Sequence, residues 1–158
     1  MIRLQKQKGL SLLEILVTVV ILSVGLLGLA SMQLQGTQSN QSAWMRSQAS
    51  FLAYDIIDRM RNNRALAINQ SSYKIVLGDK FSTPSTNCTT ADCTPAQMAE
   101  FDVYEWDTAV KQTLPDGEGE ITFETGASGS PIVRITVWWQ DSRHEGAQKE
   151  PFVYKAEL

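Results

Sequence analysis

The sequence has few of the residues on which catalytic and metal sites depend. Its 158 residues include one histidine, His144, and two cysteines, Cys88 and Cys93. A single histidine in a polar loop provides no Ser-His-Asp arrangement. Two cysteines without further cysteine or histidine nearby are too sparse for zinc, and their spacing is not that of a CxxC redox motif. Because the glycines also match no phosphate-binding fingerprint, we expect no enzyme, no cofactor and no metal site.

A long basic run or stripe is also missing. The net charge is -3, and with no basic surface to neutralise phosphates we expect no nucleic-acid partner. The charges are unevenly spread along the chain. Residues 1–9 carry three basic residues and no acid, residues 10–30 carry a single charge at Glu14, and the acids concentrate after residue 78. A basic end, an apolar stretch and an acidic remainder indicate a chain that meets a membrane first.

Residues 10–30 form the long apolar stretch, LSLLEILVTVVILSVGLLGLA. A helix of about 20 such residues crosses the ~30 Å hydrocarbon core of a bilayer, and the basic residues before it favour a cytoplasmic N-terminus. Two simpler interpretations compete. A secretory signal peptide has a shorter apolar run, although residues 28–31 offer a weak cleavage site, and an uncleaved membrane anchor is the other. Neither explains Glu14.

Glu14 lies near the start of the apolar stretch, where an ionised carboxylate is unfavourable. The cost at the bilayer centre is about 2.5–3.5 kcal/mol on insertion scales, and such a group is expected to have a partner. No base lies within reach along its own helix, so we expect the partner on another molecule. An N-terminal amine released by cleavage between Gly9 and Leu10 is a fitting cation. This pairing makes sense for a segment that leaves the bilayer and packs against copies or relatives of itself.

Residues 8–14, KGLSLLE, resemble the type IV prepilin cleavage motif. That motif has a basic leader ending in glycine, an apolar residue, a glutamate four positions further on and a long apolar helix. The resemblance implies a prepilin peptidase that cuts between Gly9 and Leu10 and methylates the new N-terminus at Leu10. It also implies that Glu14 pairs with the N-terminus of a neighbouring subunit. One departure is Leu10, where Phe or Met is more usual.

The helix is expected to continue beyond the apolar stretch. Residues 31–64 contain no proline, and apolar residues recur at helical spacing. A helix from residue 10 to about 64 would be roughly 80 Å long at 1.5 Å per residue. Its second half is amphipathic and needs a folded domain to cover one face. The expected apolar stripe comprises Met45, Ala49, Leu52, Ala53, Ile56, Ile57 and Met60.

The remaining chain predicts a small α+β domain. We expect a short strand at 73–77, a loop at 81–93, and a helix from Pro95 to about Thr113 that is capped by Thr94 and Gln97. Alternating patterns predict strands at 118–125, 132–139 and 152–158 in an antiparallel sheet packed on the amphipathic half-helix. The expected buried stripe of the second helix is Met98, Phe101, Trp106 and Val110. Of Trp138 and Trp139, which point to opposite faces, we expect one in the core and the other at an interface or edge.

Together these elements give four regions and the architecture of a type IV pilin. They are a leader at 1–9, a transmembrane or filament-core half of the long helix at 10–30, an amphipathic half at 31–64 and a globular head at 65–158. If the apolar segment exports the head, a local disulfide between Cys88 and Cys93 is the natural interpretation. Closing so short a loop stabilises by about 2 kcal/mol in the chain-entropy model.

Four later runs are similar to the minor pilin PilV family: residues 51–63, 102–106, 114–119 and 135–139. This resemblance implies a low-abundance subunit that primes pilus assembly in a tip complex. Its partners would be the prepilin peptidase, other minor pilins, the major pilin and, as a further candidate, a tip-associated adhesin. The location would be the inner membrane, with a cytoplasmic N-terminus and periplasmic head, and then the pilus at the cell surface. The alternatives are a minor pseudopilin of a type II secretion system and an exported binding module with a plain membrane anchor.

Overall fold

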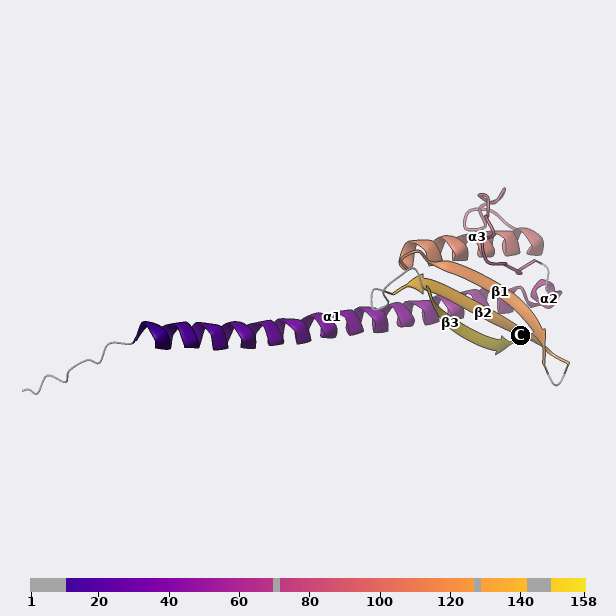
Figure 1. Cartoon of the computed structure of the whole chain (residues 1–158). Coiled ribbons are helices and arrows are strands. Elements are labelled where there is room, and N and C mark those ends of the chain that lie inside the picture. The colour runs from indigo at the N-terminus through magenta and orange to yellow at the C-terminus, as the bar shows by residue number, and fades with distance from the viewer. Residues whose placement is uncertain (1–10, 70–71, 127–128, 142–148) are drawn as a thin grey trace, which may run out of the picture. The chain divides into compact units, whose positions relative to one another are not determined.

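The computed structural model describes residues 11–69, 72–126, 129–141 and 149–158. Gly9 and Leu10, at the expected cleavage site, and His144 lie outside these ranges. The first element is the long helix α1, Leu12–Asn62, which is followed by the short helix α2, Arg64–Ala67 (Figure 1). The predicted long helix is therefore confirmed over its described part. The chain divides into two compact units, Met1–Asn40 and Gln41–Leu158, and the division falls within α1.

The second unit contains the rest of α1, α2, helix α3 at Pro95–Thr113 and one antiparallel sheet. Its strands are β1 at Glu118–Thr125, β2 at Pro131–Gln140 and β3 at Lys149–Glu157, in the order β1-β2-β3. A long helix, a small antiparallel sheet and a second helix confirm the predicted α+β fold. The last strand begins earlier than predicted, at Lys149 instead of 152.

Helix α3 begins and ends where the sequence predicted. Thr94 Oγ1 accepts a hydrogen bond from the Gln97 backbone N–H, and Gln97 Oε1 accepts one from the Thr94 N–H. This capping box satisfies two backbone donors that the first helical turn leaves unpaired, and Pro95 needs no partner because it has no N–H. The cap fixes the position of α3 next to the preceding loop.

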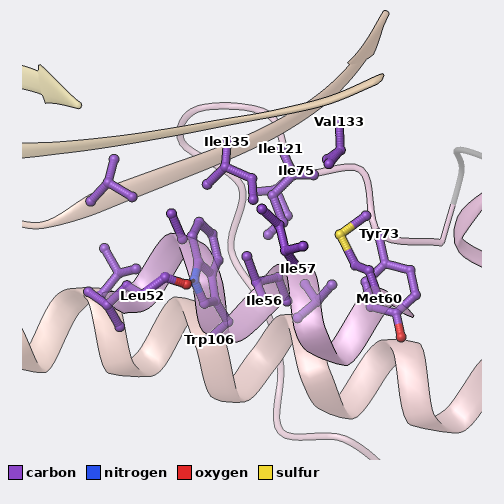
Figure 2. Close-up of a cluster of buried hydrophobic side chains, with 14 of the residues drawn as sticks. Leu52, Ile56, Ile57, Met60, Tyr73, Ile75, Trp106, Ile121, Val133 and Ile135 are labelled. Carbon is purple, nitrogen blue, oxygen red and sulfur yellow. Dashed lines mark hydrogen bonds between the residues drawn. The ribbon is translucent and has the colours of Figure 1, made fainter. Parts of the chain in front are cut away.

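The core of the second unit lies between α1, α3 and the inner face of the sheet. All seven residues of the predicted α1 stripe are buried. They pack with Tyr73, Ile75 and Trp106 and with strand residues that include Ile121 and Ile135 (Figure 2). Trp106 is held in one orientation because its Nε1 donates to the Leu52 carbonyl at 2.8 Å. The core thus supplies the cover that the amphipathic half-helix requires.

Two predictions in this unit were wrong in detail. Residues 73–77 do not form a strand: Ile75 makes an isolated bridge to Ile121, and a turn follows at once. In that turn Asp79 Oδ2 accepts from the Val76 N–H, which takes the backbone away from β1. Met98 is only half-buried, because one side of it borders a cavity.

Candidate functional site

Every described residue of the first unit, 11–40, is exposed. The large apolar side chains of this stretch, from Leu12 to Leu34, are 46–86% exposed. Its most apolar window has a mean hydropathy of 2.6, so α1 is long and apolar enough to cross a membrane by length and composition. No described residue covers these side chains. Exposed apolar surface of this extent is typical of a segment that contacts a bilayer or other chains.

Two hydroxyl groups within the apolar part of α1 are satisfied by the helix itself. Thr18 Oγ1 donates to the Ile15 carbonyl at 2.8 Å, and Ser23 Oγ donates to the Val19 carbonyl at 2.7 Å. A hydroxyl without a partner is costly in hydrocarbon, where no water replaces the missing bond. The two residues therefore do not prevent this stretch from entering a bilayer or a dry helix bundle.

Glu14 is the single charged residue of this stretch, and it lies in the first turn of α1. A negative charge is favourable there because the unpaired backbone N–H groups give the helix N-terminus a partial positive charge. Residues 10–40 contain no lysine, arginine or histidine. The structure thus places Glu14 near the end of α1 at which an N-terminal amine would emerge. Cleavage at Gly9, methylation at Leu10 and the pairing of Glu14 stay predictions.

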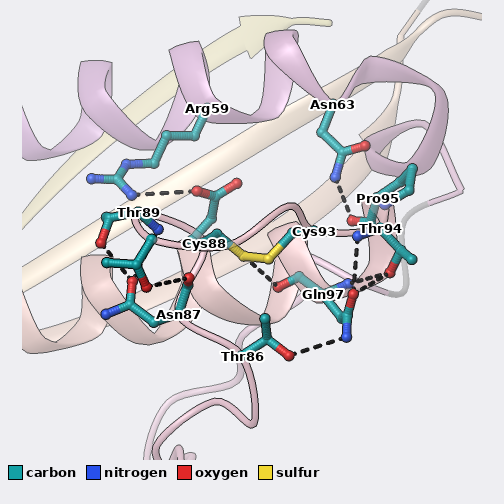
Figure 3. The surroundings of a disulfide bond; sticks show 12 residues. Arg59, Asn63, Thr86, Asn87, Cys88, Thr89, Cys93, Thr94, Pro95 and Gln97 are labelled. Atoms are coloured by element: carbon teal, nitrogen blue, oxygen red, sulfur yellow. Dashed lines mark hydrogen bonds and ion pairs between the residues drawn. A yellow bond between two sulfur atoms is a disulfide. The ribbon is translucent and has the colours of Figure 1, made fainter.

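The second candidate region surrounds the disulfide in the head. Cys88 and Cys93 form the predicted bond, with Cα atoms 5.6 Å apart. The closed loop is fastened to α3, since Gln97 Nε2 donates to Thr86 Oγ1 at 3.1 Å and the Gln97 carbonyl lies 3.8 Å from Cys88 Sγ (Figure 3). The bond therefore holds the loop beside the N-terminal end of α3.

A polar network joins α1 to α3 in the same region. Asp102, which is buried, accepts from Tyr73 Oη at 2.8 Å and pairs with Arg59 Nη1 at 3.3 Å. Arg59 Nε also contacts Asp55 at 2.9 Å, and Asn63 Nδ2 donates to Tyr73 Oη at 3.1 Å. Burial, and then the hydrogen bond to Asp102, raises the pKa of Tyr73 above its usual value. Burial lowers the pKa of Arg59, but its two carboxylate partners outweigh this effect and raise it overall.

Sequence reasoning did not find this network. A signal was available, because Asp102 lies four residues after Met98 and four before Trp106, on the face of α3 that was expected to be apolar. A carboxylate on such a face needs a buried partner. The partners could not be named from the sequence, since Arg59 and Tyr73 come from other segments of the chain.

Two family models match the chain. Residues 4–30 match the prokaryotic N-terminal methylation motif, and residues 31–104 match the family described as type IV pilin Tt1218. The matches adjoin each other and cover all of α1 and the first part of α3. The chain is a type IV pilin. The methylation motif implies a pilus subunit that a prepilin peptidase processes and that assembles with other pilins. No curated protein and no solved structure matches the chain significantly.

The pilin head has one further feature that the sequence predicted. Trp139 is almost wholly buried, whereas Trp138 on the opposite face of β2 is half-buried. Packing therefore accounts for Trp139. Its Nε1 has no hydrogen-bond partner among the described residues, which costs roughly 1–3 kcal/mol for a buried donor.

The pilin head also contains a cavity of about 350 Å³ beside the disulfide. Its walls come from the end of α1, the loop before α3 and the first turns of α3. No group of three or more His, Cys, Asp or Glu side chains within the described ranges is arranged to hold a metal ion. The residues around the cavity are Arg59, Asn62, Asn63, Cys93, Pro95, Met98 and Asp102.

Proposed function

We propose that this pilin is a minor subunit of a type IV pilus that primes filament assembly, in a tip complex with other minor pilins. The observation that carries the proposal is the match to the methylation motif over residues 4–30, which continues directly into the pilin match at 31–104. The PilV-like runs of the head favour the minor role. The pilin description of the second match favours a pilus over a secretion system.

Assembly depends on a new N-terminus in this proposal. Cleavage after Gly9 removes the basic leader, and methylation of Leu10 leaves an amine that still carries its positive charge. The amine of one subunit then pairs with Glu14 of its neighbour. Two unit charges about 4 Å apart attract by roughly 4 kcal/mol at an effective dielectric constant near 20. Because both charges lie in apolar surroundings, the pair also fixes the axial register of the two helices.

Before assembly, the proposed location is the inner membrane. The apolar part of α1 spans the bilayer with its N-terminus in the cytoplasm, where the peptidase acts, and the head lies in the periplasm. After assembly the same apolar surface is covered by other pilins. The head contributes packing surfaces and no chemical step, so the protein acts as a structural subunit and not as an enzyme.

N-terminal sequencing of the mature protein tests the first step. We expect it to begin at Leu10 with a methylated amine. A mature chain that begins at Met1, or after Ala30, contradicts the proposal and supports an anchor or a signal peptide instead.

Gene deletion tests the role in priming. We expect surface pili to fall at least tenfold and to return when the full-length gene is restored. A pseudopilin would show normal pili and a defect in protein secretion.

A Glu14→Val variant tests the pairing. We expect normal insertion and cleavage and an at least tenfold fall in the amount recovered in sheared filaments, because the N-terminal amine of the neighbour loses its counter-charge. Glu105→Gln, which neutralises an exposed acid of α3, is the matched control and should be incorporated normally. Normal recovery of Glu14→Val would count against the pairing.

A further inference from the structure

The cavity beside the disulfide has balanced charges. Arg59 and Asp102 are the charged residues in its lining, and they pair with each other at 3.3 Å. Asp55 gives Arg59 a second carboxylate partner at 2.9 Å. An anion that enters would meet the Asp102 carboxylate and a guanidinium that already has two carboxylate partners, and a cation would meet the guanidinium. The cavity therefore favours an uncharged ligand.

The lining nevertheless offers hydrogen bonds. Within the described residues, Arg59 Nη2, the Asn62 carboxamide and Asn63 Oδ1 form none. The Asn63 carboxamide is held in one orientation, since its Nδ2 donates to the Pro95 carbonyl at 2.7 Å and a carbonyl can only accept. Free donors and a free acceptor in one cavity lining complement a group with one N–H and one C=O, which is the pattern of a peptide bond.

The remaining wall is apolar. It is formed by Met98, Pro95 and Cys93 of the disulfide. Figure 3 shows Pro95 and Cys93. Methionine adapts its shape to a neighbouring side chain, so this wall suits one small apolar residue beside the peptide group. The volume, about 350 Å³, lies at the lower end of the range of roughly 300–1,000 Å³ for small-molecule pockets. It fits a short turn of chain better than a cofactor.

The walls of the cavity are rigid before any ligand arrives. The disulfide fixes one side, the capping box of α3 fixes the next, and the bonds of Asp102 to Arg59 and Tyr73 join α3 to α1. A preformed site loses little conformational entropy on binding, so a small contact contributes more to affinity.

We propose that this cavity is a docking site for an uncharged loop of a neighbouring pilin subunit, which places a peptide group against Arg59 and Asn63 and a small apolar side chain against Met98. The inference rests on the proposed function, because only an assembled pilin has such neighbours. Pilin heads can supply a loop of this chemistry: residues 81–91 of this chain carry no charge. The site would determine which subunit binds next to this head, since a charged loop would gain no binding free energy from the cavity.

Photo-crosslinking of the full chain in piliated cells tests the inference. The crosslinking residue p-benzoylphenylalanine replaces Asn62 in one chain and Pro95 in a second, so that each side of the cavity is sampled. The matched control carries it at Gln112, which is exposed near the other end of α3. After irradiation, sheared filaments are collected and the adducts are mapped by mass spectrometry.

We expect position 62 or 95 to form an adduct with an uncharged loop of another pilin at a yield at least ten times that of position 112. The inference is overturned if the chains enter filaments without such an adduct, if position 112 reacts equally, or if the adducts map to a charged segment or to lipid. Absence of the unsubstituted chain from sheared filaments is a separate outcome, which contradicts the proposed function itself.

Discussion

Helix α1 runs through both compact units, and its side chains meet different surroundings in each. In the described part of the first unit, residues 11–40, every side chain is exposed, although most of them are apolar. In the second unit, the α1 residues that face the sheet and α3 are buried. Both parts belong to one continuous helix. What separates them is that described residues of the head cover the second part, whereas no described residue covers the first.

The exposed apolar side chains of the first part can therefore contribute free energy when they are buried on assembly. Burying one Val, Leu or Ile side chain contributes about 1.5–3 kcal/mol, and the first unit has more than ten such side chains exposed. In the second unit the same kind of contribution is already used to fold the head. Stability of the head and entry into a membrane or filament should therefore respond to different residues of one helix.

Removing a buried isoleucine from α1 should have the largest effect on stability. Ile56 is fully buried, whereas Ile21 is 65% exposed. We expect Ile56→Ala to lower the free energy of unfolding by about 2–5 kcal/mol, because it removes burial and leaves a cavity. The exposed Ile21→Ala should change it by less than about 0.5 kcal/mol. Denaturant unfolding of the full chain in mild detergent, followed by tryptophan fluorescence, measures the free energy of unfolding of both variants. An equal loss in the two variants would contradict the difference between the two parts of α1.

A glycine from each unit provides the next test. A Cβ at Gly119 would lie 2.5 Å from Trp106 ring atoms, whereas one at Gly28 would meet no atom within 4 Å. Trp106 cannot move aside easily because its indole N–H is bonded to Leu52. We expect Gly119→Ala to destabilise the head by about 1–3 kcal/mol.

Gly28→Ala is the matched control for Gly119→Ala. It should leave the unfolding of the head unchanged and favour the local helix by up to about 1 kcal/mol. The same denaturant experiment compares the two variants. A head that tolerates Gly119→Ala without loss would show that the close fit of Trp106 against β1 is not required.

Removal of the disulfide tests whether the two parts of α1 have separate stabilities. We expect Cys88→Ser with Cys93→Ser to cost about 2 kcal/mol, because the open loop gains chain entropy in the unfolded state. Amide hydrogen exchange should then speed up for residues 45–60, which depend on the head, and stay unchanged for residues 12–40. Ser82→Ala with Ser85→Ala, two exposed positions of the same loop, is the control. A parallel change in both parts of α1 would argue against separate stabilities.

Acid should produce the smallest effect, and it should act on the head. Lys155 and Arg134 hold the pKa of the Glu124 carboxyl below its ordinary value of 4.5 through hydrogen bonds at 2.7 and 2.6 Å. Because the pKa of Glu124 is lower in the folded than in the unfolded state, its ionised form stabilises the folded head above pH 4.5. This stabilisation is lost as the pH falls through the folded-state pKa of Glu124. We expect Glu124→Gln to lower the melting temperature slightly at pH 7. The gap between wild type and variant should narrow as the pH falls below 4.5 and close below the folded-state pKa of Glu124. A gap that does not narrow on acidification would contradict the assignment.

Much of the fold could be predicted because its signals are local. The capping residues Thr94 and Gln97 and the proline between them define the start of α3 within four positions. The apolar spacing of α1 identified every one of its stripe residues that the head buries. Prediction failed at residues 73–77, where an apolar run resembles a strand but Asp79 and Gly78 turn the chain away.

The candidate sites divide in the same way. The motif around Gly9, Leu10 and Glu14 is contiguous, so the sequence alone contains it. The cavity could not be foreseen, because its walls come from the end of α1 and from the start of α3, which are far apart in sequence. The bond between Asp102 and Tyr73 that supports it depends on the same long-range packing.

The sequence by itself determined that this chain has a basic N-terminal segment, a methylation motif and one long helix with an apolar first half. Composition and the 3.6-residue period of apolar residues reveal these features, because both can be read from residues that are close together in the sequence. Tertiary structure alone decided which segments cover the apolar face of the second half, that Asp102 pairs with Tyr73 and Arg59, and that a cavity lies beside the disulfide. Such contacts join residues that are far apart in sequence and that only the packing of α1, α3 and the sheet brings together. No pattern within a short stretch of sequence predicts them.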